Sequence, residues 1–178
     1  MHDAKRITEC SAHYLQQVVD VLLRLSDDQY ARQDPPLYTS SVGAHIRHTL
    51  DHYFNLLDGL DGGHVDYEAR RRDPRIESDR RYAIEQVGKV IDRITPLATS
   101  DAGRPLTIRI ETGDDDSDEM GTARSTLARE LDFLLSHMIH HYGLIAMILR
   151  AQHVDPGAEF GIAPSTLRYM RDCAACAR

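Results

Sequence analysis

An apolar segment that carries two histidines four positions apart constrains this chain most. The segment from Leu127 to Arg150 has no proline and a single glycine, so its spacing predicts a helix of about six turns. His137 and His141 share one face of that helix, because residues four apart lie one above the other. Two imidazoles on one face can bind one divalent metal ion, so the pair predicts half of a metal site.

Composition and charge exclude several kinds of protein. The 178 residues carry a formal net charge of -7, which argues against binding to the phosphate backbone of nucleic acids. No apolar run approaches the ~20 residues of a membrane span, and the first residues lack the apolar region of a signal peptide. We therefore expect a cytoplasmic protein that binds neither nucleic acid nor membrane.

The three cysteines do not form a disulfide framework. Cys173-x-x-Cys176 has the spacing of a redox or zinc pair, but it lies close to the C-terminus in an alanine-rich stretch without a second such pair. A C-terminal segment without a specific role is therefore favoured over a redox or zinc site.

Helical periodicity recurs in three earlier segments. Apolar spacing predicts helices over residues 7–25, 42–60 and 79–94, separated by turn-forming residues. Capping side chains precede the second, third and fourth helices: Thr39, Ser40 or Ser41; Ser78 or Asp79; and Ser125 or Thr126.

The pattern changes between the third and fourth helices. Residues 106–112 alternate apolar with polar, which predicts a strand, and a short return strand near residues 120–123 would complete a hairpin. The acidic residues 114–119 between them lack the ligand spacing of an EF-hand. A solvated turn is therefore favoured over a calcium site.

Together these elements predict an all-α fold: a four-helix bundle with one crossover connection, at residues 61–77, and a small β-hairpin between helices 3 and 4. We expect a single domain over residues 1–178, with residues 151–178 as a C-terminal extension that packs on the bundle. In the extension, Pro164 and Ser165 suit a helix start, and the side chains suited to packing are Phe160, Ile162, Leu167 and Tyr169.

Three further histidines lie on the second helix. His45, His48 and His52 fall within an arc of roughly 60° at helical spacing. Each buried imidazole needs a polar partner or a metal, so five histidines on two helices favour a metal site. The spacing does not determine which of the three joins the pair on the fourth helix; it favours His45 or His52, which lie nearer the apolar stripe. A hydrogen-bonded histidine cluster is the alternative.

The sequence resembles the DinB-like (YfiT-like) superfamily of metal-binding four-helix proteins. The resemblance rests on Ser-Val-Gly-Ala-His-Ile-Arg-His-Thr at residues 41–49 and on His137-x-x-x-His141. Residues 44–49 are also similar to the W-H-x-x-H-T segment of ergothioneine-forming sulfoxide synthases, with alanine in place of the tryptophan. The resemblance implies that the metal ligands are His48, His137 and His141. It overrules the choice of another histidine that spacing alone favours.

The resemblance also implies a kind of chemistry. Three neutral imidazoles leave a divalent zinc, nickel or iron ion with an open position. Superfamily members of known role include thiol-dependent transferases and isomerases, in which the metal activates a low-molecular-weight thiol as its thiolate. We therefore expect a metal-dependent enzyme, either a thiol-dependent transferase or a metal-assisted hydrolase, that acts on a small molecule. The alternative is a non-catalytic metal-binding or stress-response protein, or a structural homodimer.

The sequence identifies no catalytic residue. Asp51 and Glu130 are candidates to orient the ligands through hydrogen bonds. For His45, His52 and His140, structural or surface roles are favoured over acid–base catalysis.

Overall fold

The computed structural model describes residues 2–110 and 121–176. The predicted acidic turn at residues 114–119, and the start of the predicted return strand at residue 120, lie outside the described residues. The described part is mostly helical, with one small three-stranded sheet. The expected helical class is thereby confirmed in its coarse form, while the four-helix bundle with one crossover stays a prediction.

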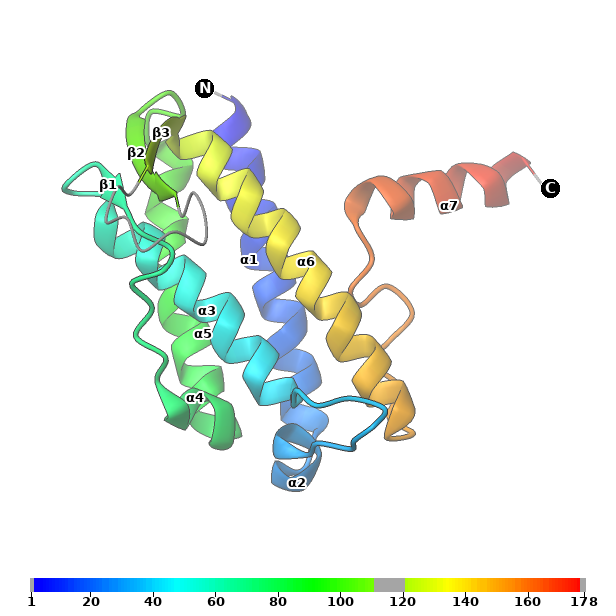
Figure 1. Cartoon of the computed structure of the whole chain (residues 1–178). Helices are drawn as coiled ribbons and strands as arrows, with labels where there is room; N and C mark the ends of the chain where they lie inside the picture. The colour runs from blue at the N-terminus through cyan, green and yellow to red at the C-terminus, as the bar shows by residue number, and fades with distance from the viewer. Residues whose placement is uncertain (1, 111–120, 177–178) are drawn as a thin grey trace.

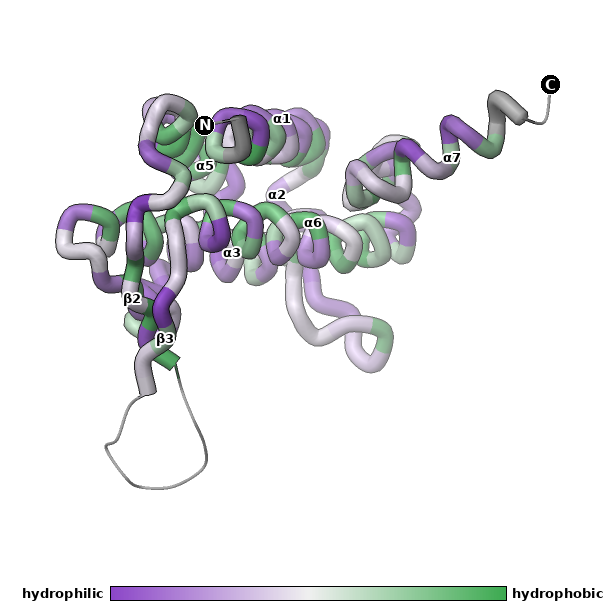
Figure 2. The backbone as a smooth tube through the Cα atoms, turned by 90° about the horizontal axis from the view of Figure 1, so that it is seen from above, coloured by the Kyte–Doolittle hydropathy of each residue, from purple (hydrophilic) through white to green (hydrophobic). Residues whose placement is uncertain are grey.

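Four long helices lie in two layers. α1 (His2–Arg24) and α5 (Arg80–Ile94) form one layer, and α3 (Val42–Gly59) and α6 (Leu127–Ala151) form the other (Figure 1, Figure 2). Across the layers α1 contacts α6 and α5 contacts α3, and the two helices within each layer also contact each other. Apolar side chains from all four helices fill the space between the layers, among them Leu15, Leu22, Ile46, Tyr53, Val87, Val90, Leu131, Leu134 and Ile145.

Side-chain caps set where the helices begin. The Ser41 hydroxyl accepts from the Ala44 N–H at 3.0 Å at the start of α3, and the Asp79 carboxylate accepts from the Tyr82 N–H at 3.0 Å at the start of α5. The Thr126 hydroxyl accepts from the Arg129 N–H at 3.3 Å at the start of α6. All three lie within the sets of capping residues that the sequence predicts.

The connections contain short helices at positions where loops were predicted. α2 (Asp27–Ala31) follows α1, α4 (Pro74–Ser78) precedes α5, and the 3-10 helix η1 (Thr95–Thr99) follows it. A capping box begins α2: the Ser26 hydroxyl accepts from the Gln29 N–H, and the Gln29 side chain accepts from the Ser26 N–H. Ser26 directly follows the first predicted helix, residues 7–25, and caps the start of a new one.

The predicted hairpin is present between η1 and α6. β2 (Pro105–Ile110) pairs antiparallel with β3 (Gly121–Thr126), in a register that runs from Pro105 opposite Thr126 to Ile110 opposite Gly121. β1 (His64–Val65) pairs in parallel with β2 inside the segment predicted as a plain crossing loop. Two residues show no periodicity, so only the contact with β2 reveals this strand. The pairing draws residues 61–73 toward the hairpin and beside α3.

Gly43 lets two helices approach closely. A Cβ on this residue of α3 would lie 2.0 Å from the backbone carbonyl oxygen of Glu77, in α4. A side chain there would force the two backbones apart. The glycine within the Ser-Val-Gly-Ala-His motif is therefore required by packing, two residues before His45, the first of the α3 histidines.

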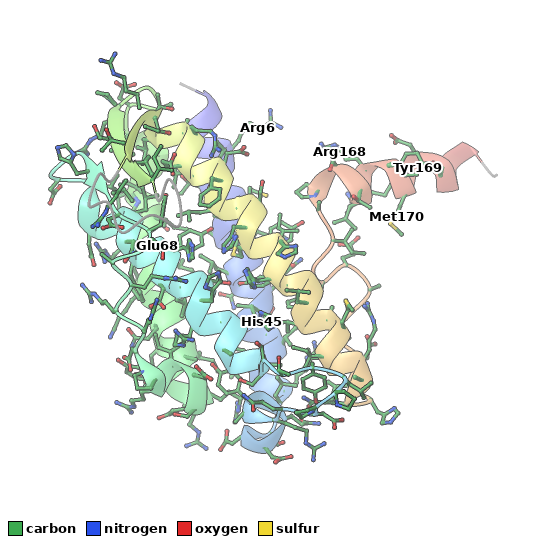
Figure 3. The ribbon with its side chains drawn as sticks, in the orientation of Figure 1. Arg6, His45, Glu68, Arg168, Tyr169 and Met170 are labelled. Atoms are coloured by element: carbon green, nitrogen blue, oxygen red, sulfur yellow. The ribbon has the colours of Figure 1, made fainter. Side chains whose placement is uncertain are left out.

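The C-terminal extension divides into a packed and an exposed part. Phe160 is buried and stacks on Tyr142 with ring centroids 5.2 Å apart, and the Tyr14 hydroxyl donates to the Ile162 carbonyl at 2.6 Å. α7 (Pro164–Cys176) then turns away from the four long helices (Figure 1, Figure 3). Tyr169 is 69% exposed, so the expectation that its side chain packs on the bundle is wrong.

Among the described residues, none of the helices combines the length and apolar character needed to cross a bilayer.

Candidate metal centre

The histidines occupy a strip where α3 and α6 meet. On α3, Ile46, Leu50 and Tyr53 are buried in the core, while His45 and His48 are half-buried beside them. On α6, Leu134, Met138 and Ile145 are buried, while His137 and His141 are half-buried. The 3.6-residue period therefore separates the two sets of side chains on each helix, with leucine and isoleucine toward the other layer and imidazoles toward the neighbouring helix.

The three ligands implied by the family resemblance come together. The ring centroid of His48 lies 5.1 Å from that of His137 and 4.6 Å from that of His141. The centroids of His137 and His141 are 4.6 Å apart. His48 and His137 are 89 positions apart in the chain, yet their rings and that of His141 share one small volume.

His52 also belongs to this cluster. Ligand atoms of His48, His52 and His137 all lie within 4.8 Å of one another, and the ring centroids of His52 and His137 are 4.5 Å apart. The Nδ1–H of His52 donates to the carbonyl of His48 at 2.9 Å, because a carbonyl can only accept. Its Nε2 therefore keeps a lone pair, the arrangement typical of a metal-ligating histidine. Spacing alone pointed to His52 as one of two choices.

Arg70 sets the tautomer of His48. Its Nη1 donates to the Nδ1 of His48 at 3.3 Å, and a guanidinium cannot accept, so the Nδ1 carries the lone pair. The proton of neutral His48 then lies on Nε2, which donates to the Nε2 of His137 at 3.0 Å. No sequence pattern pointed to Arg70, because its loop reaches α3 only through the folded path of the chain that follows β1.

His45 and His141 form a second pair at the other end of the cluster. Their Nδ1 atoms are 3.0 Å apart and their ring centroids 5.2 Å apart. Figure 3 shows His45 on the side of α3 that faces α6. His140 is exposed, in agreement with its expected surface role.

Burial keeps these imidazoles neutral. Desolvation first, and neighbouring imidazoles second, lower the pKa of His48 and of His137 to about 4 and that of His141 to about 3. Desolvation also lowers the pKa of His45 and of His52. At neutral pH each ring therefore offers one nitrogen lone pair, which is the protonation state that metal coordination requires.

Aromatic rings support the cluster from one side. Tyr67 stacks on His52 with centroids 5.6 Å apart, and Phe133 stacks on His137 at 5.7 Å. The Glu130 carboxylate accepts from the Tyr67 hydroxyl at 2.7 Å and from the Ser125 hydroxyl at 2.5 Å. Glu130 therefore orients Tyr67, and through it the ring of His52.

Asp51, the other expected orienting acid, pairs with an arginine instead. Its carboxylate is buried and lies 3.5 Å from Arg47, and Arg47 in turn pairs with Glu77 at 2.9 Å. No hydrogen bond within the described residues joins either Asp51 or Glu130 directly to a cluster histidine.

The donor set and its spacing fit a divalent transition metal. Two nitrogens bound at ~2.0–2.1 Å to a tetrahedral zinc ion lie about 3.3 Å apart. The Nε2 atoms of His48 and His137 are 3.0 Å apart, close to that separation. Neutral imidazoles, a preformed convergence and the half-exposed position of the rings all suit an ion with an open coordination position.

Comparisons with known proteins identify the family of this chain. The chain is 30% identical over 107 residues to a protein described as FK506-binding protein 5 from Rhizopus delemar, and the match covers 60% of this chain. The match spans only 28% of that protein's length. No solved structure matches the chain. The family model of the DinB superfamily matches residues 12–145, which include α3, α5, the hairpin and all five cluster histidines. The chain belongs to the DinB superfamily.

Proposed function

We propose that this protein is a metal-dependent enzyme in which His48, His137 and His141 hold a divalent zinc, nickel or iron ion. It acts on a small molecule as a thiol-dependent transferase or as a metal-assisted hydrolase. One observation carries the proposal: neutral imidazoles from two helices converge with nitrogens 3.0 Å apart, in a half-exposed position. The proposal takes α1, α3, α5 and α6 as an antiparallel four-helix bundle with one crossover.

The third ligand is the choice that needs testing. Family resemblance favours His141, whose centroid lies 4.6 Å from those of both other ligands. Nitrogen positions in the metal-free chain favour His52 instead, within the 4.8 Å group. We propose His141 as the ligand and His52 as a neighbour that supports His137.

When bound, the metal supplies a Lewis acid that lowers the pKa of a thiol or a water molecule at its open position. The protein's own residues then complete the site. With His141 bound to the metal through its Nε2, its Nδ1–H would donate to the Nδ1 of His45, and the Nε2–H of neutral His45 would be free to donate to an oxygen of the substrate. Tyr67 and Phe133 stack on the rings and keep them in place.

Elemental analysis of purified protein beside single alanine variants tests the metal site. His48→Ala, His137→Ala and His141→Ala should each weaken metal binding by at least about 100-fold, because losing a ligand lowers the affinity more than losing the hydrogen-bond partner of a ligand. The exposed His140→Ala, on the same helix, is the matched control and should bind metal like the parent. If His52→Ala abolishes binding and His141→Ala does not, the proposed third ligand is wrong.

Turnover separates the enzyme from a metal-binding protein without activity. Metal-loaded protein is mixed with cysteine and chlorodinitrobenzene, and thiol consumption is followed in the parent and in His141→Ala; ester hydrolysis is followed in parallel. Consumption that requires both the metal and His141 supports a transferase. Tight equimolar metal binding with neither reaction would favour the non-catalytic alternative. Light scattering of the same samples tests the alternative of a structural homodimer.

A further inference from the structure

A pocket of about 380 Å³ opens beside the histidine cluster. The chain that leads into α3, the first turn of α3 and the last two turns of α6 enclose it, with His45 as the residue shared with the cluster. Figure 1 shows the connection between α2 and α3 reaching across toward the C-terminal end of α6. The lining residues are Leu37, Tyr38, Thr39, Ser40, His45, Leu144, Met147, Ile148 and Ala151.

The pocket is apolar and lacks charge. None of its described lining residues is an acid, a lysine or an arginine. A charged ligand placed here would lose its hydration without gaining a counter-ion, which is unfavourable. The pocket at the opposite end of the cluster, beside Tyr67 and Phe133, is lined by Arg124 and Arg129 and differs in this respect.

Two large apolar side chains at the pocket remain exposed to solvent. Leu37 is 73% exposed and Met147 is 66% exposed. Flexible methionine adapts to ligands of varied shape, and exposed apolar groups around a concavity mark ligand sites. A pocket of a few hundred cubic ångströms with few polar groups has the usual character of a small-molecule site.

We propose that this pocket binds the uncharged, apolar part of a small-molecule ligand and places its polar end at His45. The Nδ1 of His45 is 3.0 Å from that of His141, so a ligand at His45 adjoins the cluster. The Tyr38 hydroxyl accepts from Gln152 at 3.0 Å and keeps its own proton to donate to a ligand oxygen. The inference deepens the proposed function, on which it rests for the identity of this ligand as the substrate: the substrate is a neutral, largely apolar or aromatic electrophile.

A matched pair of fluorescent probes tests the pocket without any reaction. Phenylnaphthylamine is neutral and apolar, and anilinonaphthalene sulfonate is the same skeleton with a negative charge. The neutral probe should bind at equimolar stoichiometry and more tightly than the anion. Equal or tighter binding of the sulfonate would overturn the assignment of an uncharged ligand.

Three variants locate the probe. Met147→Glu places a carboxylate at the exposed pocket rim and should weaken the neutral probe by at least about tenfold, or about 1.4 kcal/mol. Leu23→Glu makes the same kind of change at a 63% exposed position of α1, outside the pocket, and should leave binding unchanged. Ala151→Phe fills the pocket without adding charge and should also weaken binding. Retained binding in Met147→Glu and Ala151→Phe would overturn the proposal.

A second readout places the probe relative to the cluster. The His45 ring proton signal, identified by its loss in His45→Gln, should shift when the neutral probe is added to the parent protein. An unchanged signal at saturating probe contradicts the placement. Because these measurements need neither metal nor turnover, a failed pocket and a failed metal site are distinguishable. If the pocket proposal fails, the parent protein does not bind the neutral probe; if the metal-site proposal fails, the parent takes up no metal or the alanine variants bind metal as tightly as the parent.

Discussion

The two sides of α3 and α6 have opposite roles, although they lie on the same helices. One side of α6 buries Leu131, Leu134 and Met138 completely in the core, whereas the neighbouring strip holds His137 and His141 half-exposed. Apolar burial stabilises the fold in proportion to the area removed from water. Partial burial of the imidazoles lowers their pKa and contributes little to the free energy of folding. Successive residues of a helix are rotated by about 100°, so the side chains that stabilise the fold and those that can bind a metal lie on different sides of the same helix.

The largest expected effect on the free energy of unfolding concerns the core side of α6. Leu131→Ala removes a fully buried side chain and should lower the free energy of unfolding by about 2–5 kcal/mol through lost burial and a residual cavity. His137→Ala, on the histidine side, should change it far less. Denaturant unfolding of both metal-free variants measures the difference. Equal losses would show that the histidine strip is part of the structural core.

A pH titration of the metal-free protein sharpens the comparison on the histidine side. The folded-state pKa of His48 and of His137, about 4, lies below the ordinary value of 6.5. Between these values the unfolded chain binds more protons than the folded one. The free energy of unfolding should therefore be constant above about pH 6.5 and fall as the pH drops from there toward 4.

The control is the double variant His48→Gln/His137→Gln. It removes two of the groups responsible, so its unfolding free energy should fall less between pH 7.5 and pH 4.5 than that of the parent. Identical slopes in the two proteins would mean that these imidazoles titrate normally. Because both rings are half-exposed, the expected change is smaller than that of Leu131→Ala.

The smallest predicted effect concerns Arg70. Its hydrogen bond holds the lone pair of His48 on Nδ1 and the proton on Nε2, the nitrogen that faces His137. A metal at Nε2 requires the opposite tautomer, so Arg70 opposes metal binding. Arg70→Gln should tighten zinc affinity by about three- to tenfold, the equivalent of one hydrogen bond of ~0.5–1.5 kcal/mol.

Competition with a chromogenic zinc chelator measures this affinity. Arg71→Gln is the matched control, because Arg71 pairs with Asp58 and not with the cluster. Weaker zinc binding in Arg70→Gln would show that the guanidinium supports the site, and that His48 binds through a different nitrogen.

Local patterns predicted much of the fold. Ser41, Asp79 and Thr126 cap α3, α5 and α6 as expected, because a capping hydroxyl or carboxylate needs only the backbone N–H groups that follow it. The strand β2 was also predicted, because the alternation of apolar and polar residues is likewise visible within a short segment. β1 was missed, because its two residues are a strand only through their partner β2.

The candidate site shows the same division. Spacing predicted that His137 and His141 share a face of α6, since four residues make about one turn. Spacing favoured His45 or His52 on α3, whereas His48 meets the α6 pair as well, and spacing gave no sign of Arg70 or of the stacked Tyr67. Both of these come from residues 61–73, whose path depends on a strand pairing more than 40 positions away in the chain.

The sequence by itself determined the four long helices, the caps of α3, α5 and α6, and the histidine-bearing faces of α3 and α6, because these follow from interactions within a few residues. The tertiary structure decided that His48 and His52 lie against His137, that His45 lies against His141, and that an uncharged pocket adjoins them. The reason is physical: the relative shift and rotation of α3 and α6 are set by how their buried side chains interlock with those of α1 and α5, and that packing is a property of the whole fold.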